Sequence, residues 1–112
     1  MSDCIFCRIA RGEIPSKKAY EDDDLLVFHD INPAAPVHLL MVPKSHVDSL
    51  ITAQEQHAPL LGKMLVLAPR LAREQGATDG FRIVINNGPD GGQEVYHLHV
   101  HVLGGPRPWK RL

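Results

Sequence analysis

The sequence lacks the long apolar run, the apolar leader and the one-sided charge that mark three large classes of protein. No stretch of about 18 apolar residues occurs, so we expect no membrane-spanning segment. Residues 1–13 carry four charged side chains and no apolar core, which argues against a secretory signal and favours the cytoplasm. Twelve Lys and Arg residues stand against thirteen Asp and Glu residues, a net charge of −1. We therefore expect no nucleic-acid partner, whereas a few well-placed groups suffice to bind a small nucleotide.

Cysteine is scarce in this chain and histidine is abundant. The two cysteines, in a compartment that keeps thiols reduced, indicate metal or redox chemistry more than a structural disulfide. Seven histidines occur in 112 residues, and three of them lie within five positions. The composition, 44% hydrophobic and 22% charged, is ordinary for a globular protein, and no repeat or linker interrupts it. Residues 1–112 are therefore expected to form a single domain.

The pattern of apolar and turn-forming residues predicts an α+β fold with an antiparallel sheet. A short N-terminal helix is expected around Ile5 to Ile9, with Asp3 as its N-cap and Gly12 as its stop. Strands are expected over residues 19–21, 25–29, 37–42, 81–85 and 95–103.

One long helix is expected to begin near Ala58 and to end at Gly76. Thr52 and Glu55 have the spacing of a capping box, and Pro69 is expected to kink the helix. Its apolar face is predicted to consist of Leu60, Leu61, Met64, Leu65, Leu67, Ala68, Leu71 and Ala72.

The segment from His97 to Leu103 alternates histidine with aliphatic residues. In a strand, His97, His99 and His101 share one face, while the residues between them face the core. Three interpretations follow: a solvated sheet face, a metal site, or a phosphate-handling site. The last is favoured because Gly91 and Gly92 precede the segment, and the amides of a glycine-rich loop can bind an anion.

Residues 91–105, GGQEVYHLHVHVLGG, resemble the signature of the histidine-triad (HIT) family, in its Hint-like branch. The resemblance extends along nearly the whole chain, with the family's order kept at Ile5-Phe6, Glu13-Ile14-Pro15, Phe28-His29-Asp30-Ile31, Pro43-Lys44-Ser45-His46 and residues 86–92. It implies a HIT-like fold of about five antiparallel strands, one long helix and one short N-terminal helix. In relatives, the sheet extends across a homodimer.

The resemblance also implies roles for individual residues. His99 looks like the nucleophile that attacks the α-phosphorus, His101 like a phosphate contact, and Asp30 like the carboxylate that binds the ribose hydroxyls. Where Glu94 stands, many relatives carry a small hydroxyl residue; a carboxylate there would repel phosphate, so we expect only its backbone amide to contribute. The base slot matches Ile5, Phe6, Ile9, Phe28 and Ile31, and the other phosphate-loop donors match Asn86, Gly92 and Gln93.

From the residues alone, Ile5, Phe6 and Ile9 are also interpretable as core packing, and Asp30 as a turn residue before Asn32-Pro33. The activity that the resemblance implies is hydrolysis of purine nucleoside phosphoramidates or nucleotidyl-acyl conjugates, which releases AMP. The alternatives are a dinucleoside polyphosphate hydrolase and a nucleotide-binding scaffold protein.

Cys4 and Cys7 form a Cys-x-x-Cys motif, for which redox chemistry, two incidental thiols and a zinc site are all open. Some bacterial members of the resembled family hold zinc through this pair, the histidine after Pro-Lys-x and the first triad histidine. The matching residues here are Cys4, Cys7, His46 and His97, which predicts a closed, structural zinc site. The motif-free residues His29, His38 and His57 are interpreted as ordinary surface or cap residues.

Overall fold

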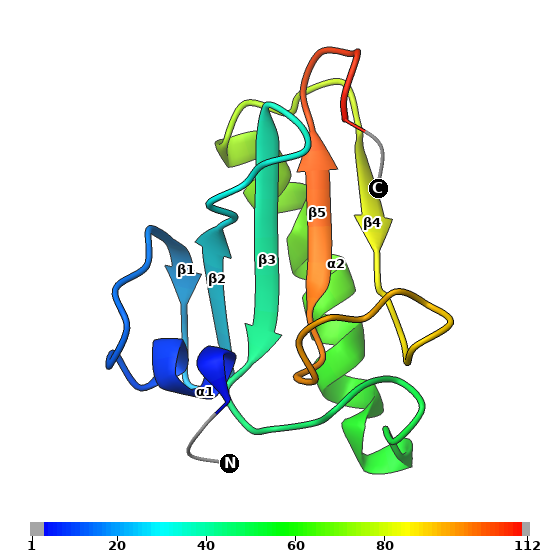
Figure 1. Ribbon diagram of the computed structural model, residues 1–112. Coiled ribbons are helices and arrows are strands. Elements are labelled where there is room, and N and C mark those ends of the chain that lie inside the picture. The colour runs from blue at the N-terminus through cyan, green and yellow to red at the C-terminus, as the bar shows by residue number, and fades with distance from the viewer. Residues whose placement is uncertain (1–3, 111–112) are drawn as a thin grey trace.

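The chain folds as one antiparallel five-stranded sheet with a long helix against one face, the α+β class predicted from the sequence (Figure 1). The structure is a computed structural model and describes residues 4–110. Its strands are ordered β1-β2-β3-β5-β4, and every neighbouring pair is antiparallel. The elements are α1 (Ile5–Ala10), β1 (Lys18–Glu21), β2 (Leu25–His29), β3 (Val37–Pro43), the 3-10 turn η1 (Glu55–His57), α2 (Ala58–Glu74), β4 (Phe81–Val84) and β5 (Val100–Gly104).

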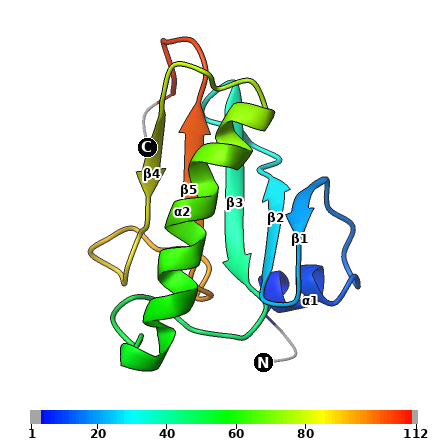
Figure 2. The ribbon, with the colours of Figure 1, turned by 180° about the vertical axis from the view of Figure 1, so that it is seen from behind.

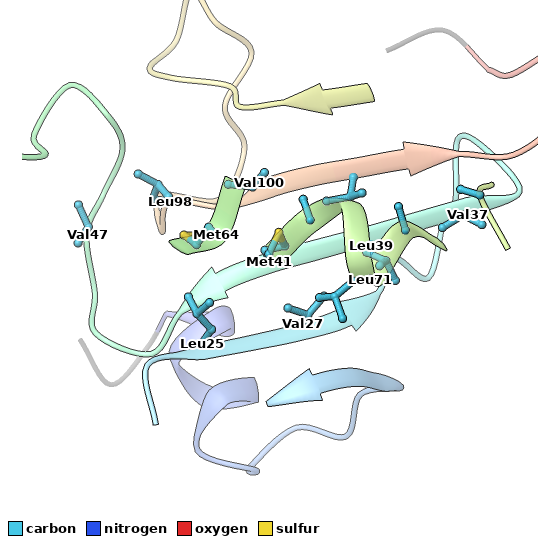
Figure 3. Close-up of a cluster of buried hydrophobic side chains, with 14 residues drawn as sticks. Leu25, Val27, Val37, Leu39, Met41, Val47, Met64, Leu71, Leu98 and Val100 are labelled. Atoms are coloured by element: carbon cyan, nitrogen blue, oxygen red, sulfur yellow. The ribbon is translucent and has the colours of Figure 1, made fainter. Parts of the chain in front are cut away.

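The main core lies between α2 and the sheet face that α2 covers, as seen from behind in Figure 2. Alternate residues of β2, β3 and β5 point to this side, among them Val27, Met41 and Val100 (Figure 3). They meet a stripe on α2 at the spacing i, i+4, i+7 and i+8, formed by Met64, Ala68, Leu71 and Ala72. This is the spacing that places side chains on one face of a helix.

The apolar face predicted for α2 is too wide by one residue. Leu65 follows Met64 by a single position, which turns its side chain about 100° away from the stripe, and 48% of its surface is exposed. Leu60, Leu61 and Leu67 flank the stripe and are partly buried against the core.

The ends of α2 follow local rules, although one predicted cap is wrong. The helix begins at Ala58 as expected, but the capping box joins Gln54 and His57, whose Nδ1 accepts the Gln54 N–H at 2.9 Å. The Thr52 hydroxyl instead donates to the Ser49 carbonyl, because the first helical turn starts later than the Thr52–Glu55 spacing implied. The helix continues through Pro69 without interruption and ends at Glu74, two residues before Gly76.

The opposite face of the sheet carries α1. Phe6 and Ile9 of α1 pack with Phe28 of β2 and Leu40 of β3 in a second cluster of buried side chains. The helix begins at Ile5, one residue after Cys4, which makes no side-chain cap. The Asp3 cap predicted from the sequence lies outside the described residues.

The final strand is four residues shorter than predicted, because its hydrogen-bonded pairing with β3 ends early. It was expected over residues 95–103, whereas β5 spans Val100–Gly104. The register pairs Val37 with Gly104 and Met41 with Val100, so continuing it would pair Pro43 with Leu98. Proline has no N–H to donate, and the Leu98 N–H goes instead to the Val47 carbonyl at 2.6 Å.

None of the helices among residues 4–110 has the length and apolarity needed to cross a membrane.

Candidate functional site

The three triad histidines lie on the sheet face that carries α1, although only His101 belongs to β5. The rings of His97 and His99 lie 5.9 Å and 5.0 Å from the Phe6 ring, and those of His99 and His101 are 5.1 Å apart. The intervening Leu98, Val100 and Val102 enter the α2 core. The predicted alternation therefore holds even where the regular ladder has ended.

His99 is buried and held in one tautomer. Its Nδ1 lies 2.7 Å from the carbonyl oxygen of His97, a contact that requires the proton to be on Nδ1. In the neutral ring, Nε2 then carries a lone pair. This is the state that a nitrogen nucleophile needs.

His101 is linked to His38, which the sequence reading took for a surface or cap residue. That interpretation is wrong: only 4% of His38 is exposed, and its Nε2 lies 2.9 Å from Nδ1 of His101. The Ala34 N–H donates to His38 Nδ1 at 2.9 Å, so in neutral His38 the proton is on Nε2 and is donated to His101. His101 must then carry its own proton on Nε2, where it is a hydrogen-bond donor. Burial and the neighbouring His99 and His38 lower the pKa of His101 to about 4.

Asp30 fulfils the turn role that was the alternative to ribose binding, and it keeps one oxygen near the histidines. Its Oδ1 accepts the Asn32 N–H at 2.8 Å, and its Oδ2 lies 3.5 Å from His38 Nε2. Desolvation is the main cause that lowers the pKa of His38, and the charge of Asp30 opposes it.

The five side chains proposed for the base slot separate into two groups. Phe6, Ile9 and Phe28 are buried in the α1 cluster, with the Phe6 and Phe28 rings edge to face at 5.8 Å. Ile5 and Ile31 are 46% and 91% exposed, respectively. The first group forms a rigid apolar floor, and the second offers uncovered apolar surface to a flat ligand.

The loop before the triad is closed by glycines and internal hydrogen bonds. Gly92 adopts φ +76°, and a Cβ on Gly91 would collide with the Asn87 backbone. The N–H groups of Gly91, Gly92 and Gln93 bond to carbonyls within the loop. The Glu94 N–H enters no hydrogen bond within residues 4–110, which leaves this amide available, while its side chain is exposed. Asn86 is partly buried beside the loop.

Gln93 braces the loop and does not present its side chain to a phosphate. Its Oε1 accepts the Gly88 N–H at 2.9 Å, and its Nε2 donates to the carbonyls of Asp48 at 2.7 Å and Val95 at 3.0 Å. The side chain is buried and both ends of its amide are satisfied. No sequence signal separated this role from that of a phosphate donor.

The four predicted zinc ligands, Cys4, Cys7, His46 and His97, come together from three distant segments. One ligand atom from each lies within 4.8 Å of the others. Nδ1 of His97 is 3.3 Å from the Cys4 sulfur and 3.5 Å from the Cys7 sulfur, and Nδ1 of His46 is 3.4 Å from the Cys7 sulfur. A tetrahedral ion with Zn–S of about 2.3 Å and Zn–N of about 2.0–2.1 Å separates such atoms by about 3.5 Å. The residues present therefore fit the metal.

Both imidazoles in this group have their other nitrogen occupied. His97 Nε2 donates to the Pro43 carbonyl at 2.7 Å, and His46 Nε2 lies 2.7 Å from Oδ1 of Asp48. These bonds place the proton on Nε2 and leave Nδ1 as the ligand, the usual arrangement of metal-bound histidine. Burial is the main cause that raises the pKa of the Cys7 thiol, an effect that a bound cation would oppose.

The HIT domain family model matches residues 11–107. The chain belongs to the HIT family. Protein HitA of Neisseria gonorrhoeae is 56% identical over 106 residues, which cover 95% of this chain and 99% of HitA. A 14 kDa zinc-binding protein of Brassica juncea is 50% identical, with 92% of this chain and 93% of that protein covered. The adenylylsulfatase HINT1 of Arabidopsis thaliana is 48% identical, with 93% and 72% covered.

Solved structures of HIT proteins share the fold of this HIT chain. A HIT family hydrolase from Legionella pneumophila superposes with a TM-score of 0.90 at 44% identity, covering 94% of this chain and 95% of that one. A zinc-bound histidine triad protein from Mycobacterium smegmatis superposes with a TM-score of 0.81 at 35% identity, covering 92% and 75%. The HIT-like fold expected from the sequence is confirmed.

The lowered pKa of His101 predicts that acid destabilises this HIT protein. The unfolded side chain binds a proton as the pH falls through its ordinary value of 6.5, whereas the folded one stays neutral down to about pH 4. The free energy of unfolding should therefore fall as the pH is lowered through this window. In His101→Gln, the slope should be shallower by up to about 1.4 kcal/mol per pH unit, the value for one proton. Urea unfolding of both proteins across the window measures this, and equal slopes would contradict the prediction.

Proposed function

We propose that this HIT protein hydrolyses purine nucleotidyl conjugates, either phosphoramidates or acyl adenylates, through a nucleotidyl group carried on His99. The observation that carries the proposal is the hydrogen bond from His99 Nδ1–H to the His97 carbonyl, which makes Nε2 the lone-pair nitrogen of the neutral ring. Placement beside His101 and on the α1 floor supports it. A Legionella relative described as a hydrolase points the same way.

In the first step, the Nε2 lone pair of His99 forms a bond to the α-phosphorus. The bond from phosphorus to the leaving group breaks, and that group departs with the electron pair: a carboxylate leaves as the anion, whereas an amine also collects a proton. Water then attacks the phosphorus, the N–P bond breaks, and AMP and free His99 result. Dividing the displacement in this way replaces one difficult attack by water with two easier steps.

His101, oriented by His38, stabilises the negative charge that develops on the phosphoryl oxygens. Because His38 donates its Nε2–H to His101 Nδ1, the His101 ring offers a donor at Nε2 and stays neutral at pH 7. The free Glu94 amide supplies a second fixed donor from the loop. Preorganised donors in a partly desolvated site stabilise the transition state without reorganising.

The nucleophile assignment predicts the behaviour of His99→Gly. Turnover of an adenosine phosphoramidate should fall by several orders of magnitude, whereas AMP binding should stay within a few-fold of wild type, because the floor and the loop remain. When the reaction is quenched during turnover, the intact mass of the wild-type protein should be increased by one nucleotidyl group. The mass of the variant should be unchanged. His29→Ala, a histidine outside both clusters, serves as the matched control. Full hydrolysis by His99→Gly would exclude the covalent route.

The leaving group is distinguished by comparing substrates. An adenosine phosphoramidate, an acyl adenylate and adenylyl sulfate share the adenylyl group and differ in the leaving group, which is an amine, a carboxylate and a sulfate, respectively. The name of the Arabidopsis relative favours including the sulfate. A dinucleoside polyphosphate tests the alternative hydrolase, and AMP binding without turnover of any of these would favour a scaffold protein.

We also propose that Cys4, Cys7, His46 and His97 bind one structural Zn²⁺. The support is the fit of the four ligand atoms to tetrahedral spacing, with zinc-named and zinc-bound relatives. When bound, the ion supplies a cross-link between α1, the loop after β3 and the triad segment. A cytoplasmic location, where thiols are kept reduced, suits such a site.

The zinc proposal predicts that Cys4→Ala/Cys7→Ala loses the metal and stability together. Zinc content, measured by atomic emission, should fall from near one per chain to near zero, and Tm should drop, because binding energy at a structural site is folding energy. His57→Ala is the control for zinc content, since this histidine lies outside the cluster. Equal zinc content in wild type and the double variant would contradict the site.

We further propose a homodimer formed along β4. This strand is an edge of the sheet, and Phe81 on it is 38% exposed beside a cleft of about 720 Å³. The opposite edge, β1, carries Lys18 and Glu21 and has an irregular register, features that discourage pairing.

Sedimentation should give twice the 12.4 kDa of the chain. Phe81→Glu should shift the equilibrium toward monomer, and Lys18→Gln on the other edge should not. A wild-type protein that sediments as a monomer at micromolar concentration would contradict the dimer.

A further inference from the structure

The two thiols of the chain belong to Cys4, the residue just before α1, and to Cys7 within α1, the helix that also packs against His99. We propose that Cys4 and Cys7 are an oxidation site whose disulfide expels the zinc ion and thereby weakens nucleotide binding. The inference rests on the proposed nucleotide site for its final effect. The oxidation and the loss of metal are separate, directly measurable events.

The two sulfurs are arranged for this chemistry. Cys4 is partly exposed at the start of α1 and meets solvent, whereas Cys7 is buried one turn later. Cys4 is the N-cap of α1, three positions before Cys7, and the two sulfurs lie within 4.8 Å of each other, so a disulfide would close a short loop at the start of the helix. These are the only two cysteines of the sequence, so an intramolecular disulfide has a single pairing.

The oxidant proposed is a peroxide. The thiolate of Cys4 attacks one peroxide oxygen, the O–O bond breaks, and the sulfur becomes a sulfenic acid while hydroxide leaves. The Cys7 sulfur then attacks the Cys4 sulfur, the S–O bond breaks, and a disulfide and a second hydroxide result. The sulfur pair loses two electrons and the peroxide gains them. The disulfide has no anionic sulfur, so Zn²⁺ keeps only His46 and His97 and leaves.

The first link from this site to the chemistry runs through Phe6, which lies between the two cysteines. Its ring contacts His97, His99 and Phe28 edge to face at 5.9, 5.0 and 5.8 Å. Metal coordination by Cys4 and Cys7 fixes the helix that carries this ring. A disulfide closes a loop within residues 4–7 alone, so this cross-link does not tie the helix to the sheet.

The second link runs from His46 to the glycine loop. His46 bonds to the Asp48 side chain, the Asp48 carbonyl accepts from Gln93, and Gln93 accepts the Gly88 N–H. Loss of the metal frees one end of this chain of hydrogen bonds. The wall and the loop of the nucleotide site therefore depend on the same four ligands.

The test uses the zinc-loaded, reduced protein and hydrogen peroxide. Zinc released to a chelating dye, the intact mass, and AMP affinity by calorimetry are followed in the same samples. We expect zinc release in step with a mass decrease of two hydrogen atoms. AMP affinity should fall by about tenfold or more, equivalent to at least ~1.4 kcal/mol. A dithiol reductant with added Zn²⁺ should restore all three.

Cys4→Asp is the matched variant, because a carboxylate can ligate zinc but cannot form a disulfide. Its zinc content and AMP affinity should be insensitive to the same peroxide treatment. Recovery of the wild-type protein by the dithiol reductant and Zn²⁺ tests the inference even if this variant folds poorly.

Three results would overturn the inference. They are formation of the disulfide with zinc still bound, oxidation to sulfinic acid without a disulfide, and loss of zinc with unchanged AMP affinity. A reduced, zinc-loaded protein that binds no AMP would instead refute the proposed function, and the disulfide and zinc measurements would still stand.

Discussion

Pro43 has a carbonyl to accept a hydrogen bond and no N–H to donate one, and this asymmetry determines the geometry at the end of the sheet. It ends the ladder between β3 and β5, so the triad segment before Val100 leaves the regular strand. The Pro43 carbonyl then accepts the Nε2–H of His97. With that nitrogen occupied, His97 turns Nδ1 toward the thiols while its backbone oxygen fixes the His99 ring. One residue thus orients both clusters.

The two faces of the sheet carry different kinds of side chain. The face under α2 is filled by aliphatic side chains and supplies the burial that stabilises the fold. The face under α1 carries imidazoles, whose proton positions are set by acceptors that lie at fixed places in the backbone. Because burial disfavours the charged form of an imidazole, His38 and His101 remain neutral near pH 7, as their lowered pKa values indicate. A rigid core on one side allows precise chemistry on the other.

The sequence predicted the fold and the triad face because each leaves a local pattern, whereas the zinc cluster needed the family resemblance to join His46 and His97 to the two cysteines. Alternation placed His97, His99 and His101 on one side, and Cys-x-x-Cys is readable without structure. His38 was missed since its role depends on register: β3 pairs Leu40 with His101, which puts His38 diagonally across, and sequence alone does not fix which residues face each other. The end of β5, the outward turn of Leu65 and the bracing by Gln93 likewise depend on tertiary contacts.

The strand order places β5, the last element of the chain, between β3 and β4. During synthesis, β4 emerges with no neighbour to pair with, and the β1-β2-β3 meander keeps an open side until residue 104 is available. His99 is therefore delivered by the same segment that closes the sheet, and folding and assembly of the histidine cluster are one late event. Until then, the free edges of β3 and β4 are open to pairing with other chains, which makes rapid closure matter for the yield of native protein.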